Sequence, residues 1–101
     1  MLVLPIKKKW FDMIVSGEKK EEYREVKPYY DKRLGFYCRY GLPTTLYFRN
    51  GYSHDSPKVK CRVKIRIDKG KEKWGAELGK IYYVLEIINI FEIENYKEEE
   101  K

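Results

Sequence analysis

The sequence predicts an α+β fold: a small barrel or sheet of mostly antiparallel strands with one or more short helices. The clearest sign is residues 58–68, where Val, Cys and Ile alternate with Lys and Arg, as in a half-buried strand. Residues 9–16 instead space their apolar side chains as a helix does, and Gly17 stands where helices often end. No strand–helix–strand repeat indicates a parallel sheet, so antiparallel pairing is favoured.

The first third of the chain predicts three elements. Residues 2–6 are apolar but contain Pro5, which fits an edge strand or the start of a strand because proline cannot donate to a ladder. The two-turn helix at 9–16 follows. Residues 21–26 are expected to be extended, since one aromatic residue alternates with charged ones and Pro28 disfavours a helical residue before it.

The middle of the chain predicts less regular structure before a hairpin. Residues 29–34 suggest one helical turn. Residues 35–43 hold two glycines and a proline, and an ordered loop is expected there. A strand is predicted at 44–49, and the Asn-Gly pair at 50–51 indicates a tight turn.

The C-terminal part predicts one more long strand segment. Residues 81–93 are rich in branched side chains, and their alternation slips at Asn89. A bulge, or two strands joined by a bend, would explain the slip. We therefore expect a single domain over residues 1–94 and a charged C-terminal tail over residues 95–101.

Composition favours a folded, basic domain. The chain has 101 residues, enough for a single core, and it is 43% hydrophobic and 16% aromatic despite being 38% charged. The formal net charge is +6 and the pI is near 9.2, which favours polyanionic partners such as nucleic acid or an acidic membrane surface.

Few residues suit a metal, a cofactor or a membrane. Cys38 and Cys61 lack a C-x-x-C spacing, and His54 is the only histidine, so we expect no metal centre and no cofactor. We expect both cysteines to be buried or unreactive thiols, although a disulfide between them stays open. No run approaches 18 apolar residues, and residues 1–6 are too short for a signal-peptide core. A soluble, cytoplasmic protein without a membrane partner is expected.

The densest cluster of charge is residues 17–24, where six of eight side chains are ionised. Lys19 is expected in a turn, with Glu22 and Arg24 on one face of the following strand. Arg24 could clamp a phosphate or carbonyl, Glu22 could accept from a base N–H, and Lys19 could neutralise charge or act as a nucleophile. The alternative is a salt-bridge network, and a buried network without an adjoining cavity would leave no binding site.

This segment resembles a known family. Residues 4–24 closely resemble the opening of ASCH domains (activating signal cointegrator homology), whose signature G-x-K-x-x-E-x-R follows a helix. A weaker likeness continues through residues 48–52 and 72–77 to the strand near Ile81. The signature positions are filled by Gly17, Lys19, Glu22 and Arg24. The resemblance implies a PUA-like fold: a closed five- or six-stranded β-barrel with helices at its ends and a ligand cleft between barrel and helix.

The resemblance implies a binding module for RNA or a nucleotide-like ligand, with enzymatic alternatives. Some ASCH-like proteins are similar to small amidohydrolases that deacylate acetylated cytidine through a lysine matching Lys19, and others are reported as ribonucleases. Lys19 and Glu22 are therefore the catalytic candidates if the chain is a hydrolase, although the amidohydrolase branch has threonine at the position of Glu22. A protein-interaction adaptor using the aromatic residues of 29–40 is a third hypothesis.

Three further groups extend the expected ligand-binding surface. The basic face of residues 58–66 could follow phosphates, unless Glu86, Glu92 and Glu94 neutralise it across the sheet. The turn at 49–54 could hydrogen-bond and stack on a base, or be only a turn. The expected ligand- or RNA-binding residues are Lys8, Lys9, Gly17, Lys19, Glu22, Arg24, Arg49, Asn50, Tyr52, Lys60, Arg62 and Lys64.

Overall fold

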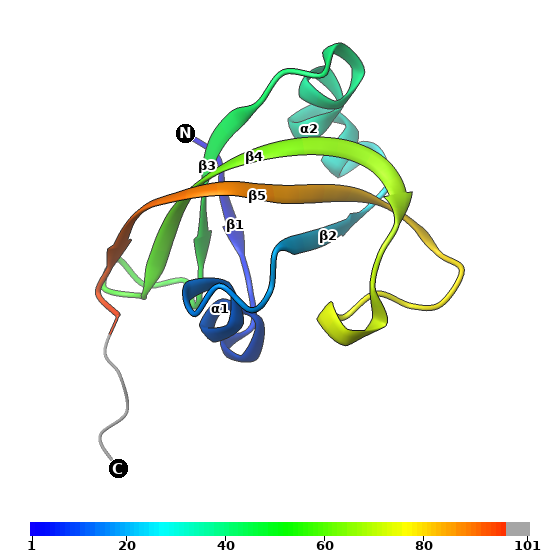
Figure 1. Cartoon of the computed structure of the whole chain (residues 1–101). Coiled ribbons are helices and arrows are strands. Elements are labelled where there is room, and N and C mark those ends of the chain that lie inside the picture. The colour runs from blue at the N-terminus through cyan, green and yellow to red at the C-terminus, as the bar shows by residue number, and fades with distance from the viewer. Residues whose placement is uncertain (97–101) are drawn as a thin grey trace.

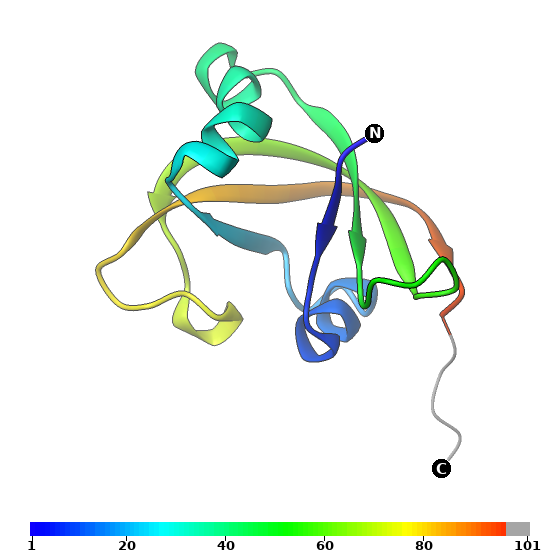
Figure 2. The ribbon, with the colours of Figure 1, turned by 180° about the vertical axis from the view of Figure 1, so that it is seen from behind.

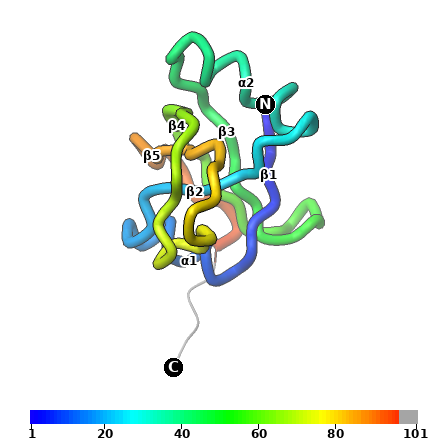
Figure 3. The backbone as a smooth tube through the Cα atoms, turned by 90° about the vertical axis from the view of Figure 1, so that its right-hand side faces the viewer, coloured from blue at the N-terminus to red at the C-terminus, as the bar shows by residue number. Residues whose placement is uncertain are grey.

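Five strands and two α-helices make up residues 1–96, which are the residues that this computed structural model describes. The predicted charged tail, residues 95–101, lies mainly outside them. Helix α2 lies at one end of the molecule, and α1 lies with the short 3-10 helix η1 at the other (Figures 1 and 3). In chain order the elements are β1 (Val3–Pro5), α1 (Lys8–Val15), β2 (Glu21–Glu25), α2 (Pro28–Tyr40), β3 (Thr44–Arg49), β4 (Lys58–Lys69), η1 (Glu72–Trp74) and β5 (Ile81–Glu94).

The strands form one mixed sheet in the order β1-β3-β4-β5-β2. Only β1 and β3 run parallel, and the other neighbours are antiparallel. Strands β4 and β5 are long and curve across the molecule (Figures 1 and 2). Within residues 1–96 no main-chain ladder joins the edge strands β1 and β2, so the sheet is open. The α+β class and the mostly antiparallel pairing are confirmed, whereas a closed barrel is not.

The core fills the concave face of this sheet. The alternation predicted for residues 58–68 is confirmed up to Ile65: the apolar side chains of β4 at positions 59, 61, 63 and 65 are buried, and the intervening cations point outward, whereas Ile67 is exposed. Phe11 and Ile14 of α1 and Leu34 of α2 cover the same cluster. A smaller cluster around Val84 packs against Tyr23 of β2. One face of β2 therefore packs against this second cluster.

Helix α1 is confirmed, but the prediction for α2 is wrong. A single turn at 29–34 and a loop at 35–43 were expected, yet the helix continues from Pro28 to Tyr40. Proline is favourable at the first helical position, and Gly41 ends the helix with φ +63°. The glycine within the helix costs only about 1 kcal/mol relative to alanine, and the complete burial of Leu34 offsets this cost.

Strand β5 is continuous and irregular. Its register against β4 shifts between Lys60 and Cys61 and again between Arg62 and Val63. Because Asn89 lies opposite Arg62, the predicted bulge near Asn89 is confirmed. None of the helices in the described part of the chain is long and apolar enough to cross a membrane.

Candidate functional site

The charged motif begins at the end of α1. Gly17 has φ +84°, a conformation that disfavours residues with a side chain, and it turns the chain out of the helix. The amide of Lys19 then donates to the Met13 carbonyl at 2.9 Å, which fixes the turn to the helix. A Cβ on Gly17 would contact nothing within 4 Å. Gly17 is therefore needed for its backbone conformation rather than for a close approach.

Lys19 is the most enclosed charged residue of the motif. Its side chain is fully buried, and its ammonium donates to the Trp74 carbonyl and lies 3.3 Å from Glu22 Oε1. The same nitrogen is 4.7 Å from the Trp10 ring and 5.0 Å from the Tyr23 ring. Burial lowers the pKa of Lys19, although the neighbouring Glu22 opposes the shift. The Lys19 ammonium is thus held next to the Glu22 carboxylate.

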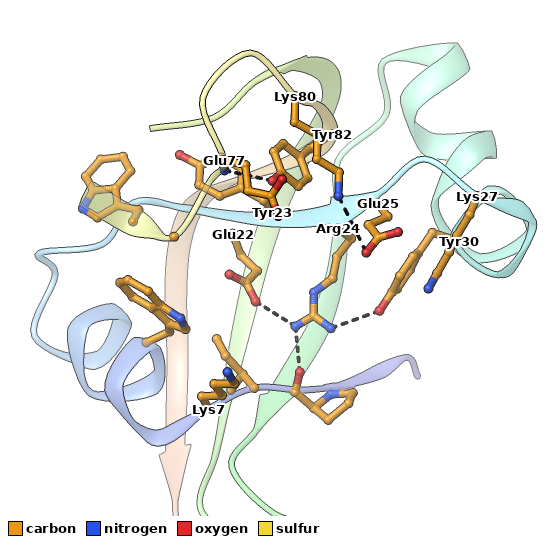
Figure 4. Close-up of a pocket in the computed structure, with 15 residues that line it drawn as sticks. Lys7, Glu22, Tyr23, Arg24, Glu25, Lys27, Tyr30, Glu77, Lys80 and Tyr82 are labelled. Atoms are coloured by element: carbon orange, nitrogen blue, oxygen red, sulfur yellow. Dashed lines mark hydrogen bonds and ion pairs between the residues drawn. The ribbon is translucent and has the colours of Figure 1, made fainter. Parts of the chain in front are cut away.

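Glu22 and Arg24 point to the same side of β2, as their spacing predicts for a strand (Figure 4). Arg24 Nη2 donates to Glu22 Oε2 and to the Pro5 carbonyl, each at 2.7 Å. Its Nη1 donates to the Tyr30 hydroxyl at 3.2 Å, and its buried Nε has no hydrogen-bond partner among residues 1–96. One guanidinium therefore connects the edge strand β2 to the other edge strand, β1, and to α2.

A cavity of about 340 Å³ adjoins this cluster. Glu22 and Arg24 line it, whereas Lys19 does not. The Tyr30 ring lies on the same side of β2 as this pair, whereas Tyr23 and Tyr82 lie on the other side of the strand (Figure 4). The full lining is Pro5, Ile6, Lys7, Trp10, Glu22, Tyr23, Arg24, Glu25, Lys27, Tyr30, Trp74, Gly75, Glu77, Lys80 and Tyr82. We call this cavity the cleft.

Further charges stand around the cleft. Lys80 Nζ is 3.9 Å from Glu25 Oε1, an exposed pair. Lys7 and Lys27 have no carboxylate within 4.0 Å in the described part of the chain, and Lys27 lies 5.6 Å from the Tyr30 ring. The cleft thus combines a buried acid–base pair with cations at its rim, a composition that suits a ligand with hydrogen-bonding edges and negative charge.

The turn after β3 forms a second hollow beside the cleft. Its volume is about 370 Å³, and it shares Pro5, Ile6 and Lys7 with the cleft. Asn50 Nδ2 donates to the Ile6 carbonyl at 3.0 Å, and the guanidinium of the preceding Arg49 donates to Gly51. Those two side chains hold the turn together, whereas Tyr52 is 84% exposed and remains available for a ligand.

The outward face of β4 is partly neutralised. Pairing across the sheet, the alternative that the sequence leaves open, occurs for Lys58 with Glu94 and for Lys60 with Glu92, at 3.8 and 3.7 Å. Arg66 pairs with carboxylates of β2, β4 and β5. Arg62 and Lys64 form no ion pair with any described residue. The row therefore keeps two free cations at its centre.

Lys8 and Lys9 lie at the start of α1. Both are exposed. Lys8 Nζ is 2.7 Å from Asp12 one helical turn later, and Lys9 Nζ lies 4.6 Å from the Trp10 ring. Neither lysine lines the cleft.

Several cleft residues were not among the predicted site residues. They include the rings of Trp10, Tyr30, Trp74 and Tyr82. Gly75 is the one local sign in the sequence that η1 and α1 come together here. Its φ is +101°, and a Cβ there would lie 3.0 Å from the Trp10 ring. The glycine after Trp74 thus lets η1 approach α1 closely enough to form a wall of the cleft.

The cysteines and acidic residues suggest no metal site. Cys38 and Cys61 are free thiols, and burial raises the pKa of Cys61 to about 12. Within residues 1–96 no three His, Cys, Asp or Glu side chains gather as a metal site would require.

Fold and site together define a small α+β domain with a charged, aromatic-lined cleft. No protein-family model matches the chain, and no curated protein or solved structure matches it. The ASCH resemblance therefore depends on the motif of residues 17–24, its preceding helix and the weaker likenesses further along the chain.

Proposed function

We propose that this chain is an ASCH-type domain of PUA-like fold that binds single-stranded RNA or a nucleotide-like ligand in the cleft. The observation that carries the proposal is the pairing of a buried carboxylate, Glu22, with the guanidinium of Arg24 on the wall of a cavity. The Arg24 bond to Pro5 joins the two edge strands where a barrel would close. In this proposal, the Arg24 side chain joins β1 and β2 where main-chain hydrogen bonds would close a barrel.

The polar pair suits the edge of a nucleobase. Arg24 Nη1 makes one hydrogen bond and retains a second N–H, while the two Glu22 oxygens each have one close cationic neighbour and keep lone pairs. A base with adjacent C=O and N–H groups could accept from Arg24 and donate to Glu22. The neighbouring rings of Trp10 and Tyr30 offer faces on which such a base could stack.

The rim supplies charge for phosphate. Lys7 and Lys27 are exposed and lack carboxylate partners within residues 1–96. Lysine ammonium groups at the mouth of a pocket attract a phosphate whose base lies inside it. The free cations of β4, Arg62 and Lys64, would add sequence-independent attraction. These groups make RNA or a nucleotide a better match than an uncharged ligand.

A hydrolase acting on a modified nucleoside is the second candidate. The lowered pKa of Lys19 favours it, because an unprotonated amine is the reactive form. Its burial favours binding instead, since the nitrogen is covered by Trp10, Tyr23 and the Trp74 carbonyl and does not line the cleft. In the binding proposal, Lys19 positions Glu22.

The test compares two conservative arginine variants. Fluorescence anisotropy would measure binding of single- and double-stranded RNA and DNA at two salt concentrations to wild type, Arg24→Lys and Arg62→Lys. Arg24→Lys keeps the charge but loses the planar fork, so we expect about a tenfold or greater loss of affinity for single-stranded RNA, against about twofold or less for Arg62→Lys. Urea denaturation would verify that each variant is folded.

The same samples separate the alternatives. Mass analysis of RNA and of N4-acetylcytidine after incubation would detect cleavage or deacylation, and product lost in Lys19→Met would establish the hydrolase. If wild type bound neither RNA nor nucleotides, or if both arginine variants bound equally well, the cleft would not be the proposed site.

A further inference from the structure

Helix α2 presents an exposed face of aromatic and cationic side chains that the cleft does not use. Tyr29, Phe36 and Tyr40 are 50%, 58% and 60% exposed. With about 100° between successive helical residues, these three rings share one side of α2 with Lys32 and Arg33. Leu34, which is fully buried, lies on the opposite side. The face is therefore a separate surface of the molecule.

Charge on this helix identifies the kind of partner. Lys32, Arg33 and Arg39 lie within α2, and Lys27 precedes it. The one carboxylate of the helix, Asp31, accepts a hydrogen bond from the Tyr83 hydroxyl at 2.5 Å on another side of the helix. A cationic face with protruding rings is complementary to a polyanion that carries flat groups, which describes single-stranded nucleic acid.

The cations and aromatic rings of this face lie next to one another. The Arg33 guanidinium lies 3.6 Å from the centre of the Tyr29 ring and donates to the Tyr29 carbonyl. Phe36 and Tyr40 have ring centres 5.1 Å apart, and the Arg39 guanidinium is 5.7 Å from the Tyr40 ring. Each exposed ring thus has either another ring or a cation beside it, which keeps it in place without covering it.

The face begins where the cleft ends. Lys27 and Tyr30, at the start of α2, line the cleft. From Tyr29 to Tyr40 the helix runs about 16 Å at 1.5 Å per residue, a length comparable to two or three nucleotides of an extended strand. We propose that α2 is a second contact surface for single-stranded RNA, on which nucleotides leaving the cleft stack. This inference rests on the proposed function of the cleft and extends it from one nucleotide to a strand.

The test uses two exposed phenylalanines as a matched pair. Phe36 is 58% exposed on α2, and Phe91 is 52% exposed near the C-terminal end of β5. Anisotropy would measure binding of a dinucleotide and of a 12-nucleotide RNA to wild type, Phe36→Ala with Tyr40→Ala, and Phe91→Ala. We expect the α2 double variant to bind the 12-nucleotide RNA about tenfold or more weakly and the dinucleotide unchanged, while Phe91→Ala equals wild type for both.

Crosslinking gives an independent readout. A 12-nucleotide RNA with 4-thiouridine at one end should, after irradiation, label a peptide that contains Phe36 or Tyr40. If Arg24→Lys weakened binding of both RNAs but the α2 variant did not differ from Phe91→Ala, the cleft proposal would stand, and the α2 inference would be overturned in favour of a protein-facing surface. If wild type bound neither RNA, both proposals would fail together.

Discussion

The inward face of β2 and the outward face of β4 hold similar ion pairs in different surroundings. On β2, Glu22 and Arg24 have side chains that are 9% and 10% exposed, and the neighbouring Lys19 has none of its side chain exposed. On β4, Lys60 and its partner Glu92 are 29% and 51% exposed. These two pairs also differ in length: 2.7 Å between Glu22 and Arg24 against 3.7 Å between Lys60 and Glu92.

The difference shows that burial, more than charge pairing, marks the site. Water screens the β4 pairs, so each contributes roughly 0–1 kcal/mol and can be lost without consequence. The charges of the β2 cluster are buried and are stabilised by a few neighbouring groups instead of by water. Removal of one partner therefore leaves a buried charge without compensation. The cleft adjoins this cluster, so in the proposed function the ligand contacts the same two side chains, Glu22 and Arg24, that carry this cost.

The largest expected difference is in stability. We expect Glu22→Ala to lower the free energy of unfolding by about 3–5 kcal/mol, because it strands the Lys19 ammonium beside Arg24 without a carboxylate. Glu92→Ala, its exposed counterpart, should cost no more than about 1 kcal/mol. Urea denaturation of both variants makes the measurement. Equal losses would show that the two regions do not differ as proposed.

A smaller effect should follow from changing only the shape of a cation. Arg24→Lys keeps the charge but cannot reach Glu22, Pro5 and Tyr30 together, so we expect it to cost about 2 kcal/mol of unfolding free energy. Arg62→Lys, on the outward face of β4, should cost less than about 0.5 kcal/mol. The comparison needs only urea midpoints and slopes. A loss at Arg62 as large as that at Arg24 would contradict it.

The pH dependence of stability should distinguish the buried lysine. Because burial lowers the pKa of Lys19 below 10.5, the unfolded chain binds more protons than the folded one between that lowered pKa and 10.5. The free energy of unfolding of wild type, minus that of Lys19→Met, should therefore rise with pH through this window. If this difference in unfolding free energy fell with rising pH, the pKa of Lys19 would be raised by folding rather than lowered.

The smallest expected change in stability accompanies the free cations of β4. We expect Arg62→Ala and Lys64→Ala each to change the unfolding free energy by less than about 0.5 kcal/mol. If they attract RNA phosphates, each should reduce the slope of log affinity against log salt by about one. Anisotropy titrations at four salt concentrations would measure the slopes. Unchanged slopes would restrict RNA contact to the cleft and α2.

The regular parts of the fold could be predicted from the sequence because their signals are local. Alternation over residues 58–68 placed β4 within one residue, and apolar spacing closed by Gly17 placed α1. Helix α2 was missed because Gly35 and scattered aromatic residues obscure its periodicity. Its stability comes from tertiary burial of Leu34, which no local pattern records.

The site was predictable where it depends on strand geometry and not where it depends on distant segments. Two-residue spacing placed Glu22 and Arg24 on one face of β2. The burial of Lys19 depends on a carbonyl 55 residues away, at Trp74. Trp10 and Trp74 come together only through the close approach at Gly75. Such convergence follows from the topology of the whole chain.

The position of β2 at the edge of the sheet bears on the order in which the protein assembles. Among the described strands its one main-chain partner is β5, where Glu22 lies opposite Leu85, more than half the chain away. The β3–β4 hairpin, by contrast, joins neighbours in sequence and can form as soon as it leaves the ribosome. Lys19, Glu22 and Arg24 are among the first residues synthesised. We nevertheless expect them to reach their native positions late in folding.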